Sequence, residues 1–203
     1  VYKRQGLIYY SVNESGVDSD GREVSTWPWT KDKAMITSVK MEGYIRPVSC
    51  NNFFRELNMV TSYKLDKFDT TACTTTEWMF YGNSSLEELD ISYFDTSGIE
   101  RMGYMFHSCS KLPTIDISSL DLSGATAITG MFRYCSGMTS IDLSHLHTGH
   151  LTSFGDLFYG CKNLQSIDLS TLDTSSATYM SGMFSGCSGL TELDVSYLIT
   201  DKC

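Results

Sequence analysis

The sequence has 203 residues, of which 41% are hydrophobic, and a formal net charge of −9. This apolar content indicates a folded protein, and no apolar run approaches the roughly 18 residues that a membrane-spanning helix needs. Residues 86–203 carry five Lys or Arg and fourteen Asp or Glu, whereas residues 1–85 carry ten of each. The acidic half excludes nucleic acid as the expected partner, because phosphate binding needs clustered Lys and Arg.

Residues 1–33 show no repeat and are predicted to form an N-terminal capping segment. Leu7 to Tyr10 fits a short strand, and the polar stretch from Asn13 to Gly21 fits a hairpin. We interpret Trp27-Pro28-Trp29 as an apolar plug over the first repeat, with carbohydrate stacking as the alternative. The start lacks an initiating Met and a signal-peptide core, so we read the sequence as a mature or cut-out fragment.

From residue 34 onward the sequence repeats with a period of 26 residues. A fixed period of this size predicts one structural unit stacked many times. We divide the repeats into a degenerate first coil at 34–59, full repeats over 60–189 and a partial repeat at 190–203. The columns that define the register are Met79-Phe80, Met105-Phe106, Met131-Phe132, Leu157-Phe158 and Met183-Phe184, followed by Cys109, Cys135, Cys161 and Cys187.

Each repeat contains a strand-like run and a run with helical spacing. Leu89 and Ile91 alternate with Asp90, as in a strand with one buried face. Ile99, Met102, Met105 and Phe106 fall at i, i+3, i+6 and i+7, the spacing of one helix face. The expected fold is therefore α/β: a right-handed leucine-rich-repeat-type solenoid with one parallel sheet and one short helix per coil. Its strands are expected at 89–91, 115–117, 141–143, 167–169 and 193–195.

The repeat resembles a known family of bacterial proteins. The string Leu-Asp-Leu-Ser-x-Leu-Asp-Thr-Ser, followed by Met-Phe-x-x-Cys-x-x-Leu, is similar to the 26-residue leucine-rich repeats of BspA-like surface proteins, most clearly at residues 164–189. His147, Leu122 and Leu157 depart from the pattern. The resemblance implies a secreted or cell-surface protein, extracellular and without enzymatic activity, that serves adhesion or recognition.

Five aspartates at strand spacing form the main candidate binding site. Their like charges repel one another, so we expect either hydrogen bonding to nearby hydroxyls and backbone groups or a role in binding a basic partner or a cation. Tyr flanked by polar groups is common at interfaces, and His145 shares the tyrosine column. The candidate residues are Asp90, Asp116, Asp142, Asp168, Asp194, Tyr93, His145 and Tyr197.

Other reactive residues are given structural interpretations. The four periodic cysteines are predicted to be buried thiols, although stacked coils leave a disulfide open by distance. His145, His147 and His150 are interpreted as surface-loop residues, and we predict no metal site, no cofactor and no catalytic group. Asn13 and Asn83 each begin a glycosylation sequon.

The function expected is a non-enzymatic binding or adhesion module. Its partner would be a host or neighbouring-cell surface protein or a glycan, and the alternative is a structural stalk that carries other domains. Leu190, Leu193, Val195 and Leu198 are expected to form an unprotected apolar edge through which the chain self-associates.

Overall fold

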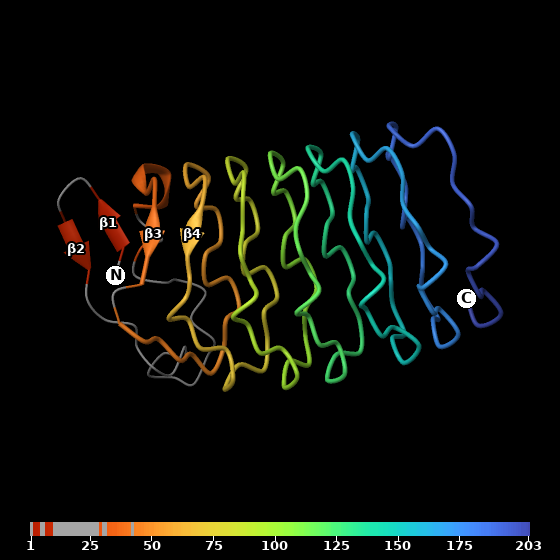
Figure 1. Ribbon diagram of the computed structural model, residues 1–203, viewed down its shortest axis with the longest axis horizontal. Coiled ribbons are helices and arrows are strands. Elements are labelled where there is room, and N and C mark those ends of the chain that lie inside the picture. Colours follow the sequence, from red (N-terminus) through yellow and green to blue (C-terminus); the bar gives the residue numbers. More distant parts are fainter. Residues whose placement is uncertain (1, 5–6, 10–28, 30–31, 42) are drawn as a thin grey trace.

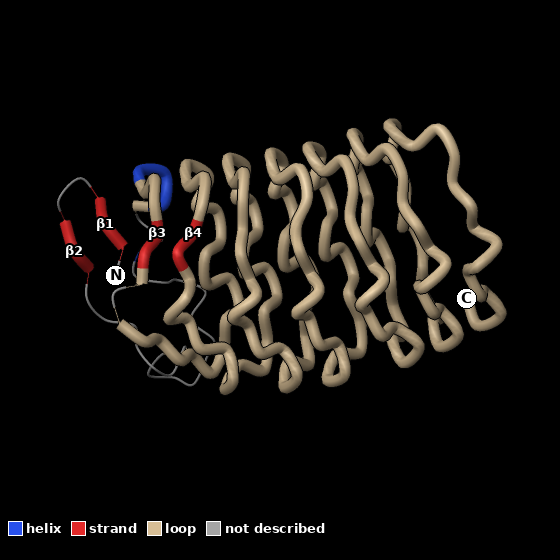
Figure 2. The backbone as a smooth tube through the Cα atoms, in the orientation of Figure 1, coloured by secondary structure: helices blue, strands red, loops and turns tan. Residues whose placement is uncertain are grey.

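The structure, a computed structural model, describes residues 2–4, 7–9, 29, 32–41 and 43–203. Successive 26-residue repeats form coils that stack side by side along the long axis (Figure 1). The described elements are β1 (Tyr2–Arg4), β2 (Leu7–Tyr9), η2 (Lys33–Met35), β3 (Val39–Lys40) and β4 (Tyr63–Lys64). Turns and irregular segments make up nearly all of the other coils (Figure 2).

The four strands form one small sheet at the N-terminal end, in the order β2-β1-β3-β4. β1 pairs antiparallel with β2, where a strand was predicted at Leu7, and also antiparallel with β3. Only β3 and β4 run parallel, with Val39 opposite Tyr63. This sheet contains neither Asp32 nor any residue from Trp78 to Cys203. The coils are therefore not joined by one continuous ladder of strands.

The predicted parallel sheet is therefore wrong for most of its length. The segments 89–91, 115–117, 141–143, 167–169 and 193–195 are not strands in the structure. Alternation nevertheless holds: Leu89 and Ile91 are buried and Asp90 is exposed. The chain turns immediately afterwards, where Phe94 N–H donates to Ile91 O at 2.9 Å, so the extended run is too short to build a ladder.

The prediction of one helix per coil is also wrong, because the described residues contain no α-helix, and their 3₁₀ turns, at Trp29 and in η2, lie only at the N-terminal end. The segment with helical spacing is instead a chain of overlapping turns. Met79 N–H donates to Thr76 O at 3.1 Å, and Tyr81 N–H donates to Trp78 O at 3.1 Å. Side chains three residues apart therefore share a face without the i→i−4 bonds of an α-helix.

The remaining N–H groups of this segment point to the next coil. Trp78 N–H donates to Gly103 O at 3.2 Å, and Phe80 N–H donates to Met105 O at 2.8 Å. In the middle of each segment, the N–H groups of even-numbered residues donate to carbonyls of the following coil. The N–H groups of odd-numbered residues donate to carbonyls three residues earlier and so close turns. We call this arrangement the turn ladder, and it takes the N–H groups that a helix would use internally.

Two residues in each turn segment have positive φ, as the third position of a type II turn requires. They lie four residues apart and recur every 26 residues. The positions are Asn52 and Glu56, Trp78 and Gly82, Tyr104 and Ser108, Gly130 and Tyr134, Asp156 and Gly160, and Gly182 and Gly186. The glycines among these positions therefore close turns.

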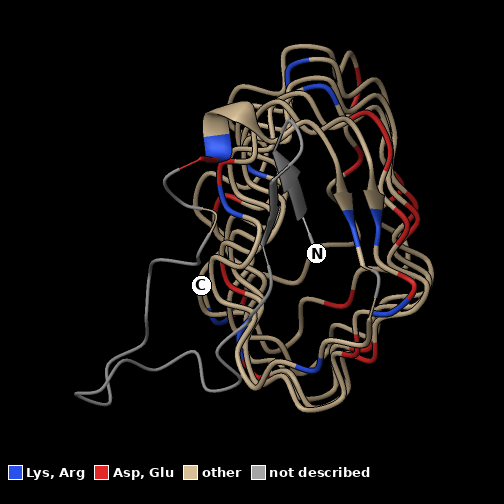
Figure 3. Ribbon diagram, turned by 90° about the vertical axis from the view of Figure 1, so that its left-hand side faces the viewer, with Lys and Arg blue, Asp and Glu red and all other residues tan. Residues whose placement is uncertain are grey.

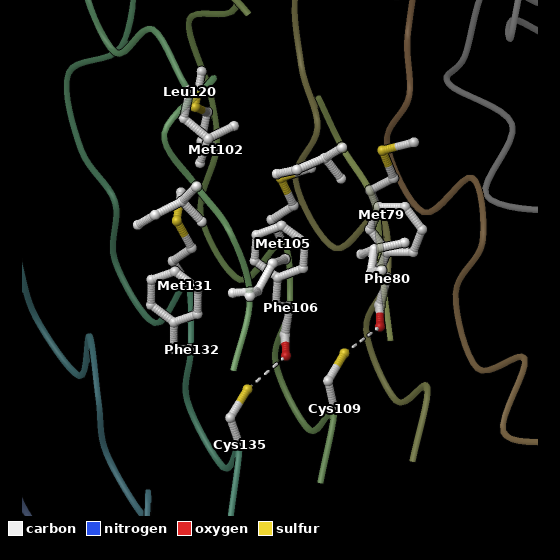
Figure 4. Packing of buried hydrophobic residues seen from close by; sticks show 14 of the residues in the cluster. Met79, Phe80, Met102, Met105, Phe106, Cys109, Leu120, Met131, Phe132 and Cys135 are labelled. Atoms are coloured by element: carbon white, nitrogen blue, oxygen red, sulfur yellow. Dashed lines mark hydrogen bonds between the residues drawn. The ribbon is translucent and has the colours of Figure 1, made fainter. Parts of the chain in front are cut away.

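The core runs the length of the stack. Phe80, Phe106, Phe132 and Phe158 are fully buried, and neighbouring rings are stacked with centroids 5.5–5.8 Å apart. Figure 4 shows Phe80, Phe106 and Phe132 of this column beside Met79, Met105 and Met131, which precede them in the sequence. Trp29 packs on Phe53, with ring centroids 5.0 Å apart, and its Nε1–H donates to Phe53 O at 2.9 Å. Trp29 is therefore a plug, as predicted, while Trp27 and Pro28 lie outside the described residues.

Candidate functional site

The five candidate aspartates are exposed but locally bonded. In every case Oδ1 accepts the backbone N–H of the serine two residues later at 2.9 Å, as in Asp116 with Ser118. The backbone N–H and the hydroxyl of Ser118 lower the pKa of Asp116 from its usual range. The geometry supports the structural interpretation of this column, since hydrogen bonding stabilises the ionised form despite the neighbouring charges.

The other three candidates are exposed but do not form a cluster. Tyr93 and Tyr197 have exposed fractions of 58% and 51%, and four repeats separate them. His145 Nε2 lies 4.0 Å from Asp142 Oδ2, a contact between two exposed groups. This side of the coil, which carries β3 and β4, is marked by acidic residues, whereas η2 lies on the opposite side (Figure 3). Its role in binding stays a prediction.

A second surface, not predicted from the sequence, follows the turn ladder on the η2 side. Lys33 of η2 forms an ion pair with Glu56, which follows Arg55 in the sequence. This surface therefore lies on the η2 side. Aromatic and arginine side chains from successive coils, half-buried except for the exposed Tyr134, contact one another along it. We call it the aromatic strip, and its members are Arg55, Trp78, Tyr81, Tyr104, His107, Arg133, Tyr134 and Tyr159.

The first half of the strip is a continuous stack. The Trp78 and Tyr104 rings are parallel within 8°, with centroids 4.1 Å apart. The Arg55 guanidinium lies 4.5 Å from the Tyr81 ring centroid and 5.6 Å from that of Trp78. Tyr81 in turn packs on His107, with centroids 4.6 Å apart. Cation–π and stacking contacts of this kind hold the side chains in fixed positions.

The second half is centred on Arg133. Its guanidinium lies 4.4 Å from the Tyr159 ring centroid and 5.1 Å from that of Tyr134, and it pairs with Asp156. Tyr134 also meets His107, with ring centroids 5.5 Å apart, and so joins the two halves. Since Arg133 has its carboxylate partner in Asp156 and Arg55 is 3.4 Å from Glu56, the strip carries little net charge.

Three strip residues adopt a backbone conformation that is costly for them. Trp78, Tyr104 and Tyr134 have φ near +60°, a region that bulky L-residues rarely enter. At the equivalent positions other coils use glycine, such as Gly130 and Gly160. Strained backbone of this kind clusters at functional sites, so retention of large rings here marks the strip as a candidate site.

His107 is held neutral inside the strip. Burial lowers its pKa to about 4, and the positive charges of Arg133 and Arg55 act in the same direction. Its Nδ1 lies 2.8 Å from Ser108 Oγ. A neutral imidazole packs between the rings without repelling the two arginines, which is why the stack holds at neutral pH.

The periodic cysteines are buried thiols, as predicted. Each donates to the carbonyl of a phenylalanine 29 residues earlier, for example Cys135 Sγ to Phe106 O at 3.0 Å (Figure 4). Burial raises the pKa of Cys161 to about 12. Cys50 and Cys73 form a disulfide, a pairing that sequence analysis did not identify, and Cys203 is an exposed free thiol.

Two further sequence-level candidates can be placed. Asn83 is fully buried, and its amide nitrogen donates to Phe54 O and Phe80 O. Its side chain is therefore inaccessible to glycosylation in the folded protein. Asn13 lies outside the described residues. His145, His147 and His150 are exposed, and the described part of the chain contains no group of three or more His, Cys, Asp or Glu that is placed to hold a metal. Nor does it contain a helix long and apolar enough to span a bilayer.

Comparison with known proteins gives one family. The family described as "Mycoplasma protein of unknown function, DUF285" matches residues 48–164 and again residues 135–202. These matches cover the turn ladder and the whole aromatic strip. The chain matches no curated protein and no solved structure.

Proposed function

The chain belongs to the DUF285 family, and from that premise we propose that it is a non-enzymatic binding module that recognises a protein partner through the aromatic strip. The observation that carries the proposal is the cluster of Trp, Tyr and Arg side chains along one side of five coils. These residue types dominate the energetics of protein interfaces. Their stacking fixes the side chains before binding, which lowers the entropy cost of ordering them.

A protein partner fits the strip better than a glycan. A sugar ring needs an open aromatic face, but the Trp78 ring is stacked on Tyr104 and also has the Arg55 guanidinium over it, 5.6 Å from the ring centroid. Tyr104 also covers Gly130, because a Cβ added there would lie 2.3 Å from the tyrosine ring. The faces of Trp78 and Tyr104 are therefore covered, which disfavours stacking of a sugar ring and favours edge contacts with a polypeptide.

An extracellular location on the bacterial surface is part of this proposal. The resemblance to BspA-like repeats supports it, and so does the Cys50–Cys73 disulfide, because disulfides persist mainly in oxidising compartments. The alternative function is a stalk that carries other domains. A stalk has no need of costly left-handed aromatic residues, so Trp78 and Tyr104 favour the binding role.

The test is a binding array of the purified protein against matrix proteins, cell-surface proteins and glycans. The strip variant carries Trp78→Gly and Tyr104→Gly, since glycine occupies the same positions in other coils and relieves the left-handed backbone. The matched control carries Asp116→Asn, Asp142→Asn and Asp168→Asn on the opposite side. Loss of a protein ligand in the strip variant alone supports the proposal. Unchanged binding by the strip variant contradicts it, and an array without any ligand favours the stalk.

A further inference from the structure

The outer face of β3 and β4 begins a charged column that continues along the stack. Lys40 and Lys64 lie opposite each other in the parallel strand pair, and the 26-residue register places Asp90 and Asp116 on the next two coils. All four side chains are exposed. The column therefore starts with two positive charges and continues with negative ones, and Figure 3 shows the basic residues beside the two strands and acidic residues along this side.

The positive end of the column is unpaired. Among the residues that the structure describes, none forms an ion pair with Lys40 or Lys64. On the acidic coils, hydrogen bonds from Ser92 lower the pKa of Asp90, and the charge of Asp116 on the next coil acts in the opposite direction. Like charges thus repel one another along the acidic part, and positive charges brought against it would relieve the repulsion.

The order of charges is complementary to itself when a second copy lies antiparallel. We consider a two-fold axis parallel to the strands that passes between the coils of Lys64 and Asp90. Lys64 of each copy then meets Asp90 of the other, and Lys40 meets Asp116, because both copies have the same coil spacing. Full overlap of the two columns would instead set Asp116 against Asp116 and Asp90 against Asp142. The charges therefore select the shorter register.

The neighbouring columns fit the same register. Lys67 and Tyr93 hold equivalent positions on the two coils beside the axis, so the lysine of each copy is placed against the tyrosine of the other. Tyr93 is 58% exposed, which leaves its ring available for such a cation–π contact. Asp66, two residues after Lys64, meets the neutral Ser92, so this carboxylate adds no like-charge contact.

We propose that this face, formed by β3, β4 and the two following coils, is a docking site for a second copy of the chain, held antiparallel by Lys64–Asp90 and Lys40–Asp116 contacts. Exposed ion pairs are individually weak, so the dimer is weak and reversible. The aromatic strip lies on the opposite side of the coils, and the dimer leaves the strip of each copy open. The dimer does not depend on the function proposed for the strip.

Sedimentation equilibrium of the intact protein tests the dimer. The variant Asp90→Asn/Asp116→Asn keeps the acceptors of its turns, and it should raise the dimer dissociation constant roughly tenfold or more, since it removes the negative half of every contact. The matched control Asp168→Asn/Asp194→Asn changes the net charge equally and alters the same column outside the register, so it should not weaken the dimer. A monomeric wild type, or equal weakening by both variants, would overturn the proposal.

A charge exchange tests the register itself. Lys40→Glu/Lys64→Glu makes all four positions negative, and Asp90→Lys/Asp116→Lys makes them positive. Each variant alone should be monomeric, and an equimolar mixture should restore the dimer, because every contact again joins opposite charges. If the second variant does not fold, carbodiimide cross-linking of mixed isotopically light and heavy wild type replaces it and should join Lys64 to Asp90 between copies. A mixture that stays monomeric, or the absence of that link, contradicts the proposed register.

Discussion

The Tyr104 ring lies directly against the backbone of Gly130: a Cβ added to the glycine would fall 2.3 Å from the ring. Gly130 also has φ of +59°. Gly130→Ala should therefore lower the free energy of unfolding by about 1–3 kcal/mol, through backbone strain and overpacking. Chemical denaturation measures the change.

The matched control is Gly98→Ala, where the nearest atom to an added Cβ is Cys73 O at 3.9 Å. This control should change stability little, since the added methyl is in ordinary contact. A Tyr104→Ala background should remove the overpacking part of the Gly130→Ala penalty and leave the strain. Additive effects of the two substitutions would show that the ring and the glycine are not coupled.

The failure of the helix prediction has a physical reason, and Gly130 is one of the residues that indicated it. Ile99, Met102 and Met105 fall three residues apart, which suits a helix but equally suits consecutive turns. The repeat and the buried columns were predictable because burial depends on which side chains share a face. The choice between helix and turns depends on where the N–H groups bond, which spacing does not encode. Gly130 and Gly182, in mid-segment, were the available signal against a helix.

The aromatic strip could not be predicted by searching for a residue type that repeats every 26 residues. One of its columns reads Arg55, Tyr81, His107, Arg133 and Tyr159, so its chemistry changes with every coil. Only the stacking contacts join these residues into one surface. The aspartate column was visible because it repeats unchanged, and that regularity reflects a turn hydrogen bond in every coil.

Acidification should destabilise the protein through His107 before the aspartates titrate. Its folded pKa of about 4 lies below the usual value of 6.5. As pH falls from about 6.5 to 4, the unfolded chain binds a proton that the folded chain resists, so the free energy of unfolding falls. Melting temperatures from pH 7 to 4 measure this. His107→Phe should flatten the profile while the exposed control His145→Gln retains it; an unchanged profile in His107→Phe would assign the effect elsewhere.

The thiols should separate into one fast group and four slow ones. Cys203 is exposed, whereas Cys109, Cys135 and Cys161 are fully buried and Cys187 is 8% exposed. A thiol reagent should label Cys203 in the native protein and reach the others only on unfolding, because burial keeps them protonated and inaccessible. Rapid native labelling of Cys135 would be incompatible with the core described.

Cys109→Ser should cost about 1–3 kcal/mol of stability, since a hydroxyl is harder to bury than a thiol.

The Cys50–Cys73 disulfide should stabilise the N-terminal coils. The bridge joins residues 23 apart in sequence. A cross-link closing a loop of this length restricts the unfolded chain, and its loss typically costs about 2–4 kcal/mol. The Cys50→Ala/Cys73→Ala variant should unfold at lower denaturant, and mild reduction of the wild type should reproduce the shift. Equal stability of oxidised and reduced protein would mean that the coils hold this region without the bridge.

The aspartate column provides a direct test of which side of the molecule binds. Asp116, Asp142 and Asp168 each accept a serine N–H through Oδ1, and asparagine has the same acceptor in the same position. We therefore expect the triple Asn variant to fold normally at pH 7, with its turns intact.

At low pH the variant and the wild type should diverge. The hydrogen bonds from Ser118, Ser144 and Ser170 lower the pKa of the three carboxylates in the folded state. Their contribution to stability is present above the unfolded pKa, near 4, and is lost as pH falls through the lower folded values. The variant lacks these carboxylates, so its melting temperature should fall less than that of the wild type between pH 4 and 2. If the aromatic strip binds the partner, the variant also keeps full affinity at low and high salt; a loss of affinity together with its salt dependence would transfer the binding site to the aspartate side.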